Sequence, residues 1–191
     1  APQLTPMALL ESKAPQIGAP LPPFRLPDVT DGTLRSPEDY PDAEALLIMF
    51  LCGHCPYVIA VEDRILALAR RYGGQPVQFL AICSNDPTAY PQDAPQALAQ
   101  RVREKHYPFP YLSDKTQEVA RAFDAVCTPE FFLYDKQRSL FYHGRLDDNW
   151  KQPDEVQHEE LAAALDACLA GQAPPQPQHP SMGCSIKWTH A

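Results

Sequence analysis

Two uninterrupted apolar runs dominate the pattern of hydrophobic and polar positions, at residues 45–51 and 77–83. Each has the length of a strand buried on both faces, as in the middle of a parallel sheet. Between them, residues 58–72 carry apolar side chains at helical spacing, and Gly73-Gly74 ends that pattern. The centre of the chain therefore predicts a strand–helix–strand unit.

Further elements are predicted after this unit. The last two predicted strands, at 130–134 and 140–143, are joined by a connection too short for a crossover helix, so they should be antiparallel. The further predicted elements are helices over 96–106, 116–123 and 159–169, a short strand at 108–112, and the antiparallel pair 130–134 and 140–143. This order predicts a three-layer α/β fold with a central mixed sheet and helices on both faces.

The two ends have a different character. Proline is abundant, with 22 among 191 residues, and half of these residues lie near the termini. Residues 1–23 form a Pro-rich N-terminal extension, followed by a predicted β-hairpin that turns at Asp31-Gly32. We therefore expect one domain over residues 1–170 and an extended, Pro-rich C-terminal tail over 171–191.

The net charge and the hydropathy of the chain limit which binding partners and which cellular compartment are expected. The net charge is −8 and there is no run of Lys or Arg, which argues against nucleic acid or an anionic membrane as a partner. No apolar stretch is long enough to span a bilayer, and no signal peptide is visible. The expectation is a cytoplasmic protein, although a chain that starts at Ala1 is also compatible with a removed leader. Nothing in the sequence predicts an oligomeric state.

Among six cysteines only Cys52 and Cys55 are close, in Cys-Gly-His-Cys-Pro between a predicted strand and a predicted helix. A structural zinc site would show a second close pair, and none follows. A helix N-terminus favours a thiolate at Cys52, and protonated His54 would favour it further. Cys55, expected one turn into the helix, could then resolve a mixed disulfide on Cys52. A redox dithiol is the favoured interpretation, with a metal-binding or structural pair as alternatives.

Several stretches resemble the thioredoxin superfamily, and within it the peroxiredoxin-like (redoxin, alkyl hydroperoxide reductase/thiol-specific antioxidant type) branch with a C-x-x-C. The similar stretches are Leu-Pro-Pro-Phe-Arg-Leu-Pro-Asp at 21–28, Phe-Leu-Cys-Gly-His-Cys-Pro-Tyr-Val at 50–58, Phe-Pro-Tyr-Leu-Ser-Asp at 109–114, Val-Cys-Thr-Pro-Glu-Phe-Phe-Leu-Tyr-Asp at 126–135, Gly-Arg-Leu-Asp-Asp-Asn at 144–149 and Gly-Cys-Ser-Ile-Lys-Trp at 183–188. Because these motifs occur in order over about residues 18–188, they are more specific than a single C-x-x-C.

The resemblance implies a thioredoxin-like fold and a thiol–disulfide oxidoreductase. Its redox-active disulfide would join Cys52 and Cys55, with His54 tuning the thiolate and no bound cofactor or metal. It also implies that Pro129 is a cis-proline facing the C-x-x-C, which leaves the backbone of Thr128 free to pair with a substrate strand. Partners would be a thiol or disulfide protein substrate and an external redox protein, in an antioxidant or redox-homeostasis role.

The chain also departs from its relatives. The buried Asp that thioredoxins usually carry six residues before the first Cys is Leu46 here, and the Pro and Thr that peroxiredoxins place before their reactive Cys are Ala45 and Met49. This weakens one alternative, a thiol peroxidase using Cys52. A second alternative is a copper carrier that uses Cys52, Cys55 and a distant His such as His143, because soft thiolates suit copper(I).

The other four cysteines have different expected roles. Cys83 and Cys168 are expected to be buried packing residues. Cys127 should lie near the active site, in either a redox or a packing role. Cys184 lies on a tail long enough to reach Cys52 or Cys55, so it is either a regulatory or resolving cysteine or part of a tail docked through Trp188.

A last polar cluster follows the final predicted strand and consists of His143, Arg145, Asp147 and Asp148. It could form a metal or substrate site, but a solvated loop is the expected interpretation.

Overall fold

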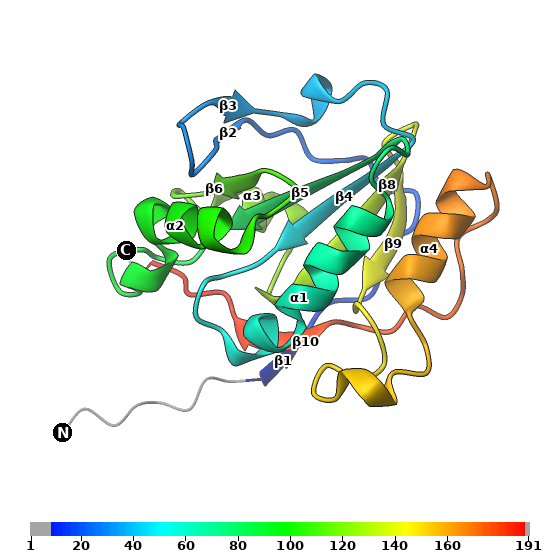
Figure 1. The fold of residues 1–191 in the computed structure, drawn as a ribbon. Coiled ribbons are helices and arrows are strands. Elements are labelled where there is room, and N and C mark those ends of the chain that lie inside the picture. Colours follow the sequence, from blue (N-terminus) through cyan, green and yellow to red (C-terminus); the bar gives the residue numbers. More distant parts are fainter. Residues whose placement is uncertain (1–8, 190–191) are drawn as a thin grey trace.

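The computed structural model describes residues 9–189, and its centre is a five-stranded mixed sheet (Figure 1). The order of its strands is β6-β5-β4-β8-β9, in which β4 runs parallel to β5 and antiparallel to β8. These strands are β4 (Ala45–Phe50), β5 (Val77–Cys83), β6 (Tyr111–Ser113), β8 (Glu130–Asp135) and β9 (Leu140–Gly144). The predicted buried strands and the antiparallel pair are therefore confirmed.

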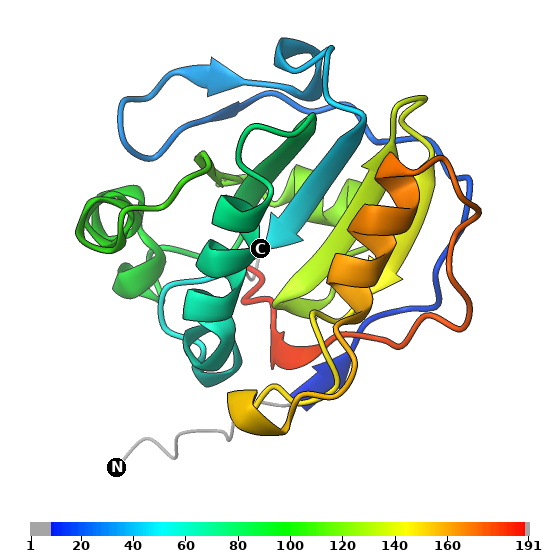
Figure 2. The same ribbon diagram turned by 45° about the vertical axis from the view of Figure 1, so that its right-hand side comes forward.

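Helices cover both faces of this sheet, as Figures 1 and 2 show. β4 is buried throughout, and its side chains alternate between two cores. Ala45, Leu47 and Met49 pack with α1 (Pro56–Arg71) and α4 (Glu160–Leu169), whereas the intervening residues pack with α3 (Glu118–Phe123). Leu98 of α2 (Pro95–Lys105) joins the first core. The expected three-layer α/β architecture is confirmed.

Two small sheets flank the central one. β2 (Leu26–Pro27) and β3 (Leu34–Arg35) form the predicted N-terminal hairpin. The other sheet, of order β1-β10-β7, was not predicted and comprises β1 (Leu9–Glu11), β10 (Met182–Ser185) and β7 (Cys127–Thr128). Part of each Pro-rich end is thus a strand, because the two ends supply backbone partners to one another; the first eight residues of the predicted extension lie outside the described residues.

Short 3₁₀ helices complete the chain: η1 (Pro37–Asp39), η2 (Pro91–Asp93) and η3 (Pro153–Glu155). Each begins with a proline, whose fixed φ and missing N–H suit a first helical turn. Among the described residues, no helix combines the length and apolar character needed to cross a membrane. The site described next lies where β4, α1, η2, β7 and β10 converge.

Candidate active site

Cys52 and Cys55 lie in the connection between β4 and α1. Cys55 is the N-cap residue of α1, and Pro56 is its first residue. The expectation that Cys55 lies one turn into the helix is wrong: the helix starts one residue after it, because proline is favourable at the first helical position. Cys55 is fully buried and Cys52 is 3% exposed, so both sulfurs belong to the core as well as to the site.

The backbone of this turn faces the Cys52 sulfur. The N–H of Cys55 donates to Cys52 Sγ at 3.3 Å, and the hydroxyl of Thr128 lies 3.4 Å from the same sulfur. Cys55 Sγ lies 3.5 Å from the carbonyl oxygen of Thr128. Both cysteines of the motif therefore contact one residue of β7.

The expected activation of the Cys52 thiol is not seen in this state. Burial, and next the negative charge of Asp93, raise the pKa of Cys52 to about 11, and the hydrogen bonds from Thr128 and the backbone offset only part of this. The predicted thiolate stabilisation assumed an accessible helix terminus, whereas the side chain is enclosed and a carboxylate lies nearby.

His54 has a second partner besides Cys52. Its Nδ1 lies 2.7 Å from Oδ2 of Asp93, and its ring stacks on Tyr90 at a centroid distance of 5.0 Å. The imidazole ring therefore contacts the Asp93 carboxylate and also lies near the Cys52 sulfur.

Asp93, in η2, is a site residue that sequence reasoning missed. Its Oδ1 accepts the N–H of Gly53 at 2.6 Å and its Oδ2 accepts a hydrogen bond from the Asn85 amide at 2.9 Å. Burial alone would raise the pKa of Asp93, but the contacts with His54, Asn85 and Gly53 outweigh it and lower the pKa. Asp93 is 40 residues from Gly53 in a polar loop, and no local pattern distinguishes it.

The Thr128-Pro129 peptide bond is cis, as expected. The accompanying expectation, that the Thr128 backbone is free for a substrate strand, is contradicted. Cys184 of β10 pairs with Thr128, and Ser185 pairs with Cys127, in an antiparallel register. The C-terminal strand β10 therefore covers the backbone edge of β7. On its other edge, β10 pairs with β1.

The disulfide in this structure joins Cys55 to Cys184, with a Cα–Cα distance of 6.3 Å, and Cys52 is a free thiol. The expected Cys52–Cys55 disulfide is therefore not the one present. The tail is docked rather than loose, since Trp188 is half-buried and Arg121 stacks over its ring at 4.4 Å. Lys187 also approaches the site: burial lowers its pKa, and the nearby Cys52 and Asp93 side chains partly oppose that change.

The remaining cysteines are free thiols, and one of them, Cys127, lies beside the site as expected, because it pairs with Ser185 next to Cys184. Cys83, at the end of β5, is buried, whereas Cys168 is only half-buried. Cys127 is buried in β7, and its thiol lies 3.6 Å from Oε1 of Glu130. Burial and the charge of Glu130 raise the pKa of Cys127, which makes it a poor nucleophile at neutral pH.

Behind the cis-proline lies a buried pair that the sequence did not suggest. Glu130 is fully buried, and its Oε2 lies 2.6 Å from Nε2 of His143, while its Oε1 accepts the N–H groups of Val126 and Cys127. The expectation that His143 belongs to a solvated loop is wrong, because it lies within β9 and stacks on Phe132.

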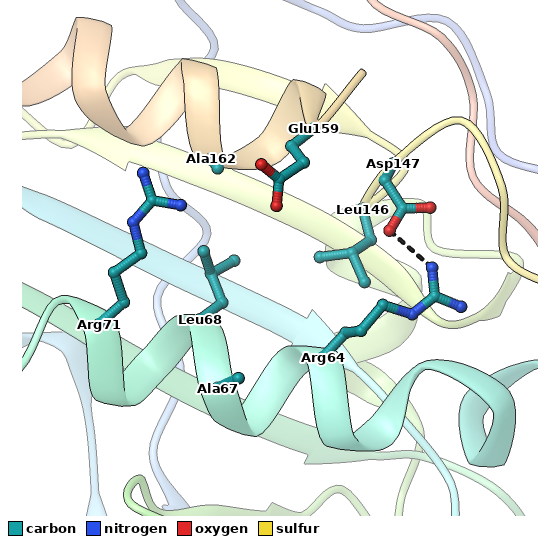
Figure 3. A pocket seen from close by; sticks show the side chains of 8 residues that line it. All are labelled: Arg64, Ala67, Leu68, Arg71, Leu146, Asp147, Glu159 and Ala162. Atoms are coloured by element: carbon teal, nitrogen blue, oxygen red, sulfur yellow. Dashed lines mark hydrogen bonds and ion pairs between the residues drawn. The ribbon is translucent and has the colours of Figure 1, made fainter. Parts of the chain in front are cut away.

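The rest of that polar cluster is also ordered by contacts. Arg64 of α1 binds Asp147 at 2.7 Å and the carbonyl groups of Asn149 and Trp150. Figure 3 shows this ion pair at one end of a pocket between α1 and α4, with Arg71 and Glu159 also at its rim. No cysteine lines this pocket, so we assign it no part in thiol chemistry.

Metal binding was an alternative for the C-x-x-C. Within residues 9–189, one group of His, Cys and acidic side chains is close enough to share an ion, formed by Cys52, His54 and Asp93. The copper hypothesis named Cys52, Cys55 and a distant His such as His143, but Nε2 of His143 contacts Glu130. The structure therefore does not bring together the ligands that this hypothesis named.

The fold and the convergence of a C-x-x-C with a cis-proline define a thioredoxin-like protein. The family model described as AhpC/TSA family matches residues 17–143, so the chain belongs to that family. The matched segment contains Cys52, Cys55 and Pro129 but ends before the tail that carries Cys184.

Solved structures extend the similarity over the tail. An uncharacterized conserved protein from Geobacillus kaustophilus is 44% identical, with a TM-score of 0.91, and the match covers 97% of this chain and 98% of the other. A hypothetical protein from Sinorhizobium meliloti 1021 is 38% identical, with a TM-score of 0.89 and coverage of 95% and 99%. Peroxidoxin BcpB from Mycobacterium tuberculosis, at 20% identity, a TM-score of 0.56 and coverage of 81% and 94%, shares the fold. No match was found among curated proteins.

Proposed function

We propose that this protein is a thiol–disulfide oxidoreductase that works through a mixed disulfide on Cys52. The observation that carries the proposal is the meeting of Cys52 and Cys55 at Thr128-Pro129, at the start of α1. Such a site attacks a disulfide with one thiolate and releases the product with the second. Membership of a redox family supports it.

The proposed reaction begins with Cys52 as a thiolate in the fully reduced protein. The thiolate attacks one sulfur of the substrate disulfide, so a Cys52–substrate bond forms, the substrate S–S bond breaks, and the other substrate sulfur leaves as a thiolate that takes up the proton given by Cys52. The Cys55 thiolate then attacks Cys52, which forms Cys52–Cys55 and releases the second substrate thiol. Two electrons and two protons pass from the protein to the substrate, and an external dithiol must restore them.

In this proposal the His54–Asp93 pair accepts the proton of the Cys52 thiol. One ligand atom from each of Cys52, His54 and Asp93 lies within 4.8 Å of the others. Proton transfer to a nearby base is needed because burial disfavours the thiolate. No bound cofactor enters the reaction.

Replacement of Cys52 by Ser tests the assignment. Turnover of oxidised glutathione or of insulin disulfides, driven by dithiothreitol, should fall to the rate without enzyme in Cys52→Ser. Cys168→Ser, which removes a half-buried thiol on α4, is the matched control and should retain the parent rate. Equal turnover of Cys52→Ser and the parent protein would overturn the proposal.

A thiol peroxidase is the second candidate. The observation in its favour is the Thr128 hydroxyl, which lies 3.4 Å from Cys52 Sγ and can donate to a bound peroxide even though Ala45 and Met49 replace the usual residues. Rapid, Cys52-dependent consumption of hydrogen peroxide by the reduced protein, with slow disulfide turnover, would favour this function over the first.

A further inference from the structure

The C-terminal strand β10 occupies the backbone edge beside the cis-proline. Cys184 and Ser185 pair with Thr128 and Cys127. The approach is so close that a Cβ built on Gly183 would lie 2.0 Å from the Thr128 carbonyl oxygen. Only glycine at this position permits the contact, so the residue before Cys184 is adapted to seat the strand there.

The tail is held on both sides of Cys184 by contacts that do not involve sulfur. Before it, the N–H of Ser181 donates to the hydroxyl of Ser12 at 2.8 Å. After it, Ile186 is buried and its N–H donates to the Val126 carbonyl at 3.0 Å. Contacts other than the disulfide therefore help to hold Cys184 beside Cys55.

The same tail is tied to the loop that carries Asp93. The Lys187 N–H donates to the Asn85 side-chain oxygen at 2.8 Å, and the Asn85 amide donates to Asp93 at 2.9 Å. Gln117 donates to the Lys187 carbonyl at 2.9 Å. Tail, C-x-x-C turn and η2 therefore form one connected polar network around the three sulfurs.

We propose that Cys184 is a third redox cysteine that takes the disulfide over from Cys52; the proposal rests on the thiol–disulfide function proposed above. The Cys184 thiolate attacks Cys55 Sγ of the Cys52–Cys55 disulfide. The Cys55–Cys184 bond forms, the Cys52–Cys55 bond breaks, and Cys52 leaves as a thiolate that takes up the proton given by Cys184. No electrons are gained or lost in this exchange.

The exchange moves the disulfide to the two most buried of the three sulfurs. Cys55 and Cys184 are 0% and 1% exposed and Cys52 is 3% exposed, so Cys52 is the least buried of the three sulfurs. Cys52 contacts the Cys55 backbone and lies beside the partly exposed Gly53 and His54. The reverse attack of Cys52 on Cys55 is the route by which reduction starts. In this proposal the Cys55–Cys184 disulfide is an oxidised state of the redox site that is shielded from solvent, and it is not only a structural cross-link that holds the tail.

The first experiment maps disulfides by alkylation and peptide mass analysis of the full, oxidised chain. We expect Cys55–Cys184 in the parent protein and in Cys168→Ser, and Cys52–Cys55 in Cys184→Ser. Gly183→Ala should shift the population toward Cys52–Cys55 by displacing β10. Only Cys52–Cys55 in the parent protein would overturn the proposal.

The second experiment separates a relay from a structural disulfide. Reduction of Cys55–Cys184 by thioredoxin should be about tenfold slower or more in Cys52→Ser than in the parent protein, because access depends on Cys52. Equal reduction rates would overturn the relay while leaving Cys52-dependent turnover intact. Failure of the proposed function has a different signature, namely turnover that persists in Cys52→Ser.

Discussion

Oδ2 of Asp93 lies 2.7 Å from Nδ1 of His54, so a carboxylate from η2 is paired with the residue between the two cysteines of the motif. The other oxygen of Asp93 accepts the Gly53 N–H. Asp93 therefore holds the shape of the C-x-x-C turn and also places negative charge near Cys52. The two effects can be separated, because an amide retains the oxygen acceptor and loses the charge.

Replacing Asp93 by Asn should make Cys52 more reactive in the oxidised protein. The charge of Asp93 contributes to the raised pKa of Cys52, and its removal lowers that pKa. Each pKa unit changes the small thiolate fraction about tenfold, so alkylation by iodoacetamide at pH 7 should become roughly three- to tenfold faster. In the parent protein the rate should rise with pH up to a pKa of about 11.

The matched control for this experiment is Asp154→Asn, an exposed carboxylate of η3. It should leave the alkylation rate of Cys52 unchanged. A slower reaction in Asp93→Asn would contradict the electrostatic account and would make the positioning of the turn the main effect of Asp93.

Replacement of Glu130 by Leu should destabilise the protein by about 2–4 kcal/mol, because it leaves buried donors without acceptors. Glu130 accepts the N–H groups of Val126 and Cys127, and it also contacts His143. Urea unfolding at pH 7 measures the loss. Glu130→Gln keeps an acceptor oxygen and should recover a large part of the free energy of unfolding; equal losses in both variants would point to the charge rather than the hydrogen bonds.

The ion pair between Glu62 and Arg101 predicts a pH-dependent contribution to stability. Arg101 Nε lies 2.5 Å from Glu62 Oε2, and Glu62 also accepts the Tyr107 hydroxyl. Burial would raise the pKa of Glu62, but these hydrogen bonds lower it. The stabilisation is therefore present above the unfolded-state pKa of about 4.3 and is lost as pH falls through the folded-state pKa.

Accordingly, Glu62→Gln should lower the free energy of unfolding at pH 7 by roughly 1 kcal/mol, a value reduced by the partial exposure of Arg101. The difference from the parent protein should narrow below pH 4, where the parent loses the charge of Glu62. Glu104→Gln, an exposed carboxylate on α2, provides the comparison and should change stability little at either pH. A difference that is constant with pH would contradict the ion-pair explanation.

Loss of the Gln117 side chain should loosen the end of the tail. Its amide donates to the carbonyl groups of Ser84 and Lys187, and its oxygen accepts the Thr189 N–H. Gln117→Ala should cost about 1–3 kcal/mol and accelerate trypsin cleavage after Lys187, measured by mass spectrometry. Cleavage after Lys115 serves as an internal reference; equal acceleration at both sites would indicate global rather than local loosening.

The central elements were predictable because their determinants are local. The run at residues 45–51 specifies a buried strand by itself, and the C-x-x-C is visible because its two cysteines are close in sequence. Pro129 was also identifiable from its surrounding motif. The antiparallel pair β8 and β9 followed from the length of the connection between them.

Tertiary structure decided the environment of those residues. Asp93 reaches Gly53 across 40 residues, and Cys184 reaches Cys55 across 129, so no local spacing records either contact. The pKa of Cys52 also depends on enclosure and on the charge of Asp93, neither of which a motif contains. The sequence by itself determined the strand, C-x-x-C and helix unit and the Thr128-Pro129 motif that meets it. The packing of distant segments decided which sulfurs are joined, which thiol is free and what covers the site, because burial and long-range pairing arise only when the whole chain is folded.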